Sequence, residues 1–187
     1  MYIINYLVTS TIFLLSCGQA NSDKVVSTAT DTIPKTNPAY QDKSFFSKVY
    51  FSQTDAELIL GEKAYRSDSS STIKKDTLEI KRAYTANSID QKTGETGVIY
   101  FMIEEYNQEA SAKKAYDFFK TANEKNEGIK IVHDMGDDAY FHSDGKNFYF
   151  ILVRKGKKMF GIKVNKITSF TSLKEFNLVS KKISDAL

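Results

Sequence analysis

Alternating apolar and polar positions predict much of the secondary structure of this 187-residue chain. Neighbouring side chains of a strand point to opposite faces, and a period of two recurs along several segments. We expect strands at residues 77–85, 98–106, 129–133, 140–142, 147–154 and 159–165. Asp144-Gly145 and Gly156-Lys157 separate the last three segments, and such junctions are typical of tight hairpins. The pattern predicts an antiparallel sheet of about five to six strands.

Apolar positions three and four residues apart predict two long helices and one short N-terminal helix. The short helix begins with Thr54 as its cap and ends at Gly61. Residues 64–75 have no such period, and we expect a loop there.

The first long helix is capped by Asn107 and runs to about Asn123. The second begins at Ser172, where Glu175 completes a capping box, and runs to about Asp185. The apolar stripes of the two helices consist of Ala112, Ala115, Tyr116, Phe119 and Ala122 in the first, and of Leu173, Phe176, Val179 and Ile183 in the second.

The fold class expected from these elements is α+β, with the two long helices covering one face of the sheet. The segments 98–106 and 147–154 are apolar on both faces, so the second face also needs a cover. Residues 45–65, a bound apolar ligand or a partner protein could supply it. We expect residues 45–65 to do so.

The order of elements resembles that of small α+β domains of the Mog1/PsbP-like type. The resemblance spans about residues 50–187. Two segments carry it, Ala56-Glu-Leu-Ile-Leu-Gly61 and Met135-Gly-Asp-Asp-Ala-Tyr140. It implies an antiparallel sheet with flanking helices, as in small exported lipoproteins. The resemblance brings no catalytic residue with it.

An uncharged, largely apolar run ends at Cys17, the only cysteine of the chain. The run has about the length of the apolar region of a signal peptide and is shorter than the roughly 20 residues of a transmembrane helix. Leu14-Leu15-Ser16-Cys17 resembles the bacterial lipobox. This resemblance implies cleavage after Ser16 and attachment of acyl chains such as palmitate to Cys17. Residues 1–10 contain no Lys or Arg, which departs from the usual positive start of a signal peptide.

Three regions follow from these patterns: a lipoprotein signal peptide at residues 1–16, a lipidated N-terminus and flexible tether at 17–43, and a single α+β domain at 44–187. The tether is rich in small polar residues and contains both prolines, Pro34 and Pro38. Most of the 13 Phe and 11 Tyr fall in the domain. With Cys17 used for lipid, an apolar core rather than disulfides must stabilise the domain.

The residue types that support catalysis or metal binding do not form a recognisable constellation. His133 and His142 lie near several aspartates without a metal-site spacing, so we expect exposed turns and no metal. Glu104 and Glu105 are neighbours on a strand, so they point to opposite faces, and we expect them to be solvated at the strand end. Ser111 to Lys114 has Ser-x-x-Lys spacing on a solvated helix. We expect no catalytic residue and no cofactor.

A basic stretch at the last predicted hairpin comprises Arg154, Lys155, Lys157 and Lys158. We expect a solvated turn, with contact to anionic lipid heads as the alternative. The net charge of +3 is too small to indicate nucleic-acid binding.

The sequence therefore predicts a membrane-anchored, exported lipoprotein of the cell envelope, on its periplasmic or surface side. Its partners would be the bilayer, through acylated Cys17, and an envelope protein or a small apolar ligand. The leading hypothesis is a non-catalytic binding or scaffolding module. The alternatives are a carrier whose aromatic groove contains Tyr100, Tyr149 and Phe150, and a hydrolase whose site is not evident from sequence.

Overall fold

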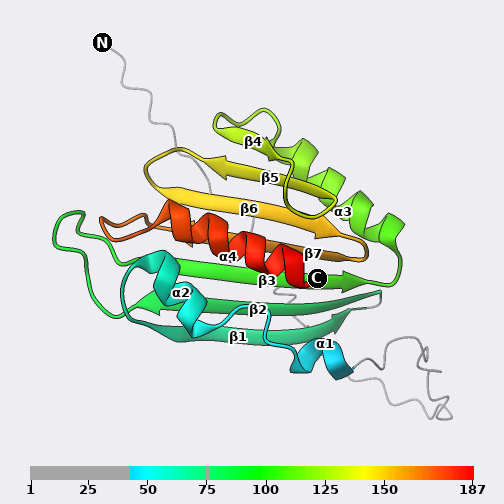
Figure 1. The fold of residues 1–187 in the computed structure, drawn as a ribbon, viewed down its shortest axis with the longest axis horizontal. Coiled ribbons are helices and arrows are strands. Elements are labelled where there is room, and N and C mark those ends of the chain that lie inside the picture. Colours follow the sequence, from blue (N-terminus) through cyan, green and yellow to red (C-terminus); the bar gives the residue numbers. More distant parts are fainter. Residues whose placement is uncertain (1–42, 75) are drawn as a thin grey trace, which may run out of the picture. The chain divides into compact units, whose positions relative to one another are not determined.

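The computed structural model describes residues 43–74 and 76–187 (Figure 1). Within them the elements are α1 (Lys43–Ser47), α2 (Gln53–Leu60), β1 (Ala64–Lys74), β2 (Thr77–Ala86), β3 (Val98–Tyr106), α3 (Glu109–Asn123), β4 (Ile129–Val132), β5 (Asp138–Ser143), β6 (Phe148–Lys155), β7 (Lys158–Asn165) and α4 (Leu173–Ala186). The strands form one antiparallel sheet in the order β1-β2-β3-β7-β6-β5-β4. The fold is α+β, as the sequence predicts. The predicted signal peptide, the lipobox and all of the tether except residue 43 lie outside the described residues.

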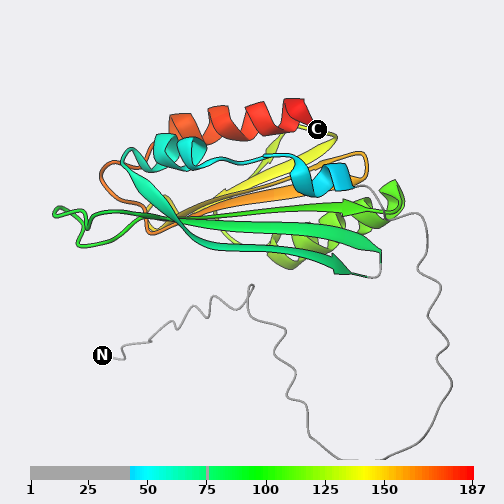
Figure 2. The same cartoon turned by 90° about the horizontal axis from the view of Figure 1, so that it is seen from below.

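Helices lie on both faces of the sheet (Figure 2). Helices α1, α2 and α4 lie on one face, which we call the major face, and α3 lies on the other, which we call the α3 face. The sequence predicts instead that both long helices share a face and that residues 45–65 cover the other. That expectation is wrong, because α3 and α4 lie on opposite faces and residues 45–60 join α4. No helix of the described residues other than α3 covers the α3 face.

The main core fills the space between the major face and its helices. Phe51, in the link between α1 and α2, stacks on Phe101 of β3 with ring centroids 5.1 Å apart. Each fully buried side chain of this size contributes about 1.5–3 kcal/mol to folding. Other buried members are Phe45, Ile59, Leu60, Ile80, Tyr84, Ile99, Ile103, Ile151, Val153, Phe160, Ile162, Val164, Phe176, Val179 and Ile183.

Both ends of α2 contact α4 or the segment that precedes it. Ser52 and Asp55 form a capping box at the start of α2, and Asp55 also pairs with Lys182 of α4. Gly61 ends α2 with a φ of 72°, and a Cβ at this position would lie 2.2 Å from the carbonyl oxygen of Phe170. Ser172 accepts a hydrogen bond from the backbone of Glu175 and caps α4, as predicted.

The predicted caps of the other two helices are wrong. Ser52, not Thr54, caps α2. Helix α3 begins at Glu109 after Gln108, which makes no side-chain cap. Asn107 donates instead to the carboxylate of Asp76 at 2.9 Å, across the base of β2 and β3.

The sheet has one strand more than the predicted maximum of six, because residues 64–74 form β1 rather than a loop. This strand pairs with β2 and carries a bulge between Arg66 and Asp68. Only Ala64 of β1 is buried. An edge strand with both faces solvated has no apolar period, so backbone pairing defines it instead. A polar, bulged edge also opposes pairing with other chains.

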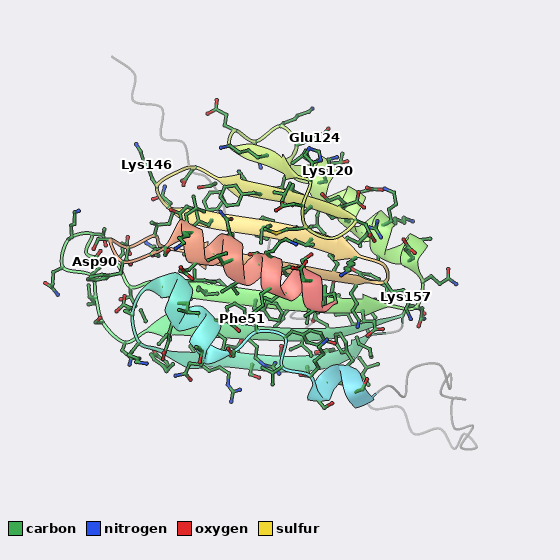
Figure 3. The ribbon with its side chains drawn as sticks, in the orientation of Figure 1. Phe51, Asp90, Lys120, Glu124, Lys146 and Lys157 are labelled. Atoms are coloured by element: carbon green, nitrogen blue, oxygen red, sulfur yellow. The ribbon has the colours of Figure 1, made fainter. Side chains whose placement is uncertain are left out.

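A buried carboxylate holds the long loop between β2 and β3. Asp90 is 3 % exposed and accepts hydrogen bonds from the backbone of Ser169 at 2.7 Å and of Lys92 at 2.9 Å. Figure 3 shows Asp90 in this loop, at the opposite end of the sheet from Lys157. The Ser169 amide, with help from Lys92 and Thr93, holds the pKa of Asp90 well below its usual range. Asp90 thus ties this loop to the segment between β7 and α4.

We expect Asp90→Asn to lower the free energy of unfolding at pH 7. The depressed pKa means that ionised Asp90 stabilises the fold above about pH 4, and that this contribution is lost as the pH falls through the folded-state pKa. The stability gap between variant and wild type should therefore shrink toward pH 3 in urea titrations. The exposed Asp134→Asn is the control. Equal stability of the Asp90 variant and the wild type at pH 7 would contradict this role.

Candidate functional site

Side chains on the α3 face form rows across the sheet, because each register pair places its side chains on the same side. One row runs from Ala83 through Tyr100, Lys163 and Phe150 to His142. The next row, closer to the β2–β3 loop, contains Val98, Asn165 and Phe148. We call the surface of these two rows, with Tyr65, Thr85 and Met102 beside them, the open half of the α3 face.

Helix α3 leaves the open half uncovered. It packs on β3, β6 and β7 at their ends near the β6–β7 turn. There the ring of Tyr116 contacts the ring of the buried Tyr140 edge-on, with centroids 5.9 Å apart. Figure 2 shows no helix below the remaining part of the sheet. Tyr100 is 43 % exposed, and Val98, Met102, Phe148 and Phe150 are half-buried. The open half is an aromatic and apolar surface that the described residues bury only in part.

A lysine stands in the middle of this surface. The Nζ of Lys163 lies 5.8 Å from the ring centroid of Phe148, close enough for a cation–π contact. Partial burial lowers the pKa of Lys163, because desolvation disfavours the charged form. Within residues 43–74 and 76–187, no ion pair joins Lys163 to a carboxylate. This amine is therefore a cation among aromatic rings.

The imidazole of His142 borders the same surface. Its ring meets Phe148 edge-on at 4.8 Å, and burial lowers its pKa despite a hydrogen bond with the backbone of Glu127. Burial would raise the pKa of nearby Asp144, but hydrogen bonds from the Asn147 and Lys146 amides lower it to about 2. The Asp144 carboxylate thus stabilises the turn between β5 and β6.

The structure brings together two of the three residues predicted to line an aromatic groove. Tyr100 and Phe150 lie in one row, with Lys163 between them. Tyr149 projects from the major face, where it packs against Phe176 at 5.8 Å. Neighbouring residues of a strand cannot share a face, so Tyr149 does not line the same surface.

The two histidines do not meet at a metal site. His133 is exposed beyond β4 and lines two shallow hollows of about 240 and 480 Å³ along that strand, whereas His142 is half-buried in β5. Within the described part of the chain, no three potential metal ligands cluster.

Glu104 is not solvated, contrary to expectation. It is 8 % exposed and lies opposite Glu79, which is 5 % exposed. Tyr106 donates to Glu104 at 2.6 Å, while Lys74 and Lys81 pair with Glu79 at 2.9 and 3.1 Å. Glu105 points to the other face, as predicted, and pairs with the lysines of the β6–β7 turn.

The two facing glutamates have opposite pKa shifts. Burial raises the pKa of Glu104; a hydrogen bond from Tyr106 lowers it, but the charge of Glu79 adds to the rise. Burial would also raise the pKa of Glu79, but hydrogen bonds from its two lysines outweigh it and lower that pKa. Such a split is also found in acid–base pairs of enzymes. Both carboxylates are buried under their own partners, so the pair acts as a structural ion cluster.

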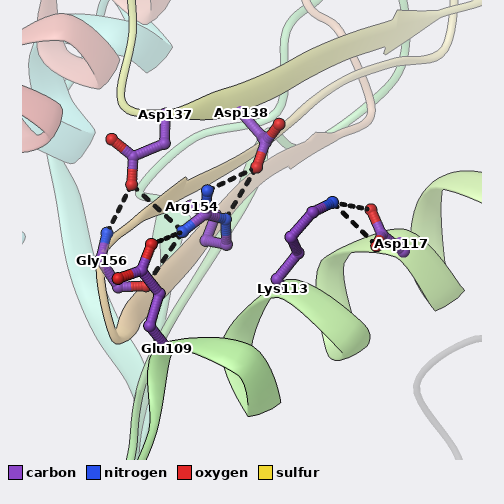
Figure 4. Close-up of polar contacts among 7 residues, drawn as sticks. All are labelled: Glu109, Lys113, Asp117, Asp137, Asp138, Arg154 and Gly156. Atoms are coloured by element: carbon purple, nitrogen blue, oxygen red, sulfur yellow. Dashed lines mark hydrogen bonds and ion pairs between the residues drawn. The ribbon is translucent and has the colours of Figure 1, made fainter.

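Arg154 does not belong to an exposed basic turn (Figure 4). It is 5 % exposed and meets Asp138 of β5 at 2.7 Å, Asp137 at 3.1 Å and Glu109 of α3 at 3.2 Å. Its side chain points to the α3 face, opposite to that of Lys155. Lys157 is the most exposed residue of the predicted basic stretch. The ammonium group of Lys155 donates a hydrogen bond to the backbone carbonyl of Ser184 in α4. Arg154 therefore ties α3 to β5 and β6.

Candidate catalytic groups do not converge on the open half. Ser111 and Lys114 are both exposed on α3, as expected. The Tyr140 hydroxyl is buried beneath α3, and burial raises the pKa of Tyr140 to about 12. The open half offers aromatic rings, an amine and an imidazole, which suit binding.

Comparisons of the chain with models of protein families, with curated proteins and with solved structures find no match. Among the helices of the described residues, none has the length and hydropathy of a membrane span.

Substitution of the two facing glutamates should have opposite pH-dependent effects. Because the pKa of Glu79 is lowered, its contribution is present at pH 7 and declines on acidification, so Glu79→Gln should cost about 1 kcal/mol at pH 7 and less at pH 3. Because the pKa of Glu104 is raised, its ionisation destabilises the fold, so Glu104→Gln should become more stable than wild type as the pH rises to 8. Urea unfolding across this range measures both. The same sign for both variants at pH 8 would refute the assignment.

We expect Arg154→Met to destabilise the domain by about 1–2 kcal/mol, because it removes the hydrogen bonds of the buried guanidinium to Asp138 and Glu109, whose carboxylates remain partly solvated. The exposed Arg66→Met on β1 should change stability by less than about 0.5 kcal/mol. Chemical denaturation of both variants provides the comparison. A loss no greater than that of Arg66→Met would show that the network adds nothing.

Proposed function

We propose that the protein is a lipid-anchored, exported domain that acts without catalysis and binds a partner through the open half of the α3 face. The observation that carries this proposal is the uncovered surface around Tyr100, Lys163 and Phe150. Large aromatic side chains left accessible beside a well-packed core are typical of interaction surfaces.

The anchoring part of the proposal rests on sequence. Leu14-Leu15-Ser16-Cys17 supports attachment of acyl chains to Cys17, and several chains on one residue suffice for stable anchoring. The resemblance to the Mog1/PsbP-like type is part of the same proposal. The seven-stranded antiparallel sheet with flanking helices is compatible with it.

A macromolecular partner fits this surface better than a small apolar ligand does. Sites for small molecules are concave and bury most of the ligand surface. The hollows described above lie along β4, whereas Tyr100 and Phe150 stand on the broad face of the sheet. With Tyr149 on the major face, the aromatic groove of a carrier also loses one of its three residues.

Metabolic labelling with a radioactive fatty acid in the native cell tests the anchor. We expect wild type to incorporate the label and Cys17→Ala to lose it completely, since no other cysteine can form the thioether. The control Ser22→Ala, five residues further on, should be labelled like wild type. Equal labelling of wild type and Cys17→Ala would exclude lipidation at this site.

A further inference from the structure

We propose that the open half binds an acidic polypeptide segment, whose carboxylate pairs with Lys163 while its apolar side chains pack on Tyr100, Phe148 and Phe150. This inference rests on the proposed function and specifies the chemistry of the partner.

The charge argument begins from the surroundings of Lys163. Asp144 is held by the amides of its own turn, and Glu79 is held by Lys74 and Lys81. Asp68 stands on the edge strand, beyond Ala83 and Tyr100 in the same row. A purely apolar partner would bury the Lys163 amine without a counter-charge, which weakens such a complex. A partner that supplies a carboxylate avoids this cost.

The shape of the surface favours a polypeptide. Tyr116 and Lys120 border the hollow beside β4, so the opposite flank of α3, with Ala115, Phe118 and Ala122, is turned toward the open half. Phe118 is 70 % exposed there. The helix forms a step along one side of the open half. A helix packs about 8–10 Å from its neighbour, so a segment of a partner protein lying beside α3 would complete the layer.

The chemistry of the surface agrees with this occupant. Tyr, Phe and Met are enriched in the cores of protein interfaces, and Tyr100, Phe148, Phe150 and Met102 provide them here. Binding by strand addition is disfavoured at the β1 edge, which is polar and bulged. We therefore place the partner on the face of the sheet, with Lys163 as the polar contact that determines specificity.

Selection from a displayed library of random 15-residue peptides tests the proposal. The bait is the protein as isolated from its own cells, held in nanodiscs of neutral phosphatidylcholine when it carries acyl chains and in buffer when it does not, with empty nanodiscs or bare matrix for counter-selection. We expect wild type to enrich peptides that combine Asp or Glu with aromatic or aliphatic residues. Lys163→Glu should weaken these peptides at least tenfold and enrich basic ones, and Lys163→Met should enrich peptides without an acidic preference.

Matched controls lie on α4, on the other side of the sheet. Lys174→Glu reverses a charge on a side chain that is 82 % exposed, and Leu178→Ala truncates an apolar side chain that is 54 % exposed. Both should leave the peptides bound as in wild type. Circular dichroism melts of every variant ensure that only folded baits are compared.

Tyr100→Ala separates the failure of this inference from that of the proposed function. Acidic peptides that are lost with both Tyr100→Ala and Lys163→Glu support both. Some selected peptides could lose binding to Tyr100→Ala and yet lack acidic residues, or bind Lys163→Met as tightly as wild type. Such peptides would overturn the acidic partner and leave the binding surface in place. If no selected peptide depends on Tyr100, both proposals fail. Lys163-dependent binding to phosphatidylglycerol vesicles, with no acidic peptide selected, also overturns the acidic partner.

Discussion

Apolar side chains on both faces of the central strands are the constraint on which the rest of this structure depends. Strands β3, β6 and β7 carry bulky residues inward and outward, so one layer of helices cannot bury them. Burial of a large apolar side chain is worth about 1.5–3 kcal/mol, which makes cover on both faces the stable arrangement. Helices α1, α2 and α4 bury the main core on one face, and α3 covers the other face in part.

The α3 face changes in character along the strands. At the end near the β6–β7 turn, the buried Arg154 pairs with three partly exposed carboxylates, and the buried Glu79 faces the buried Glu104. At the end near the β2–β3 loop, aromatic and apolar side chains surround Lys163, and the nearest carboxylate of that row is Asp68 on the edge strand. The polar end has its partners within the domain, whereas the aromatic end does not. That contrast is the reason that we propose the aromatic end as the binding surface.

Sequence patterns predicted the elements whose signals are local. The Gly145 and Gly156 turns located the hairpins of β5, β6 and β7, and Ser172 located the start of α4. Strand β1 was missed because its serines and threonine show no apolar period. Glu79 and Glu104 lie opposite each other only because of the register in which β2 pairs with β3. The sequence did not predict this contact, because the length of the loop between the two strands does not determine their register. Arg154 was taken for a surface residue because its carboxylates come from β5 and α3, which are distant in sequence.

The outer edge of the sheet has a further effect on how copies of this protein would behave together. Strand β1 presents a bulge, Asp68 and a row of small hydroxyl side chains to its surroundings. Such an edge is a poor template for another strand, so neighbouring molecules cannot readily extend one continuous ladder. Crowded copies therefore cannot readily form a continuous fibril of stacked sheets, because such growth needs both edges of each sheet and β1 resists pairing.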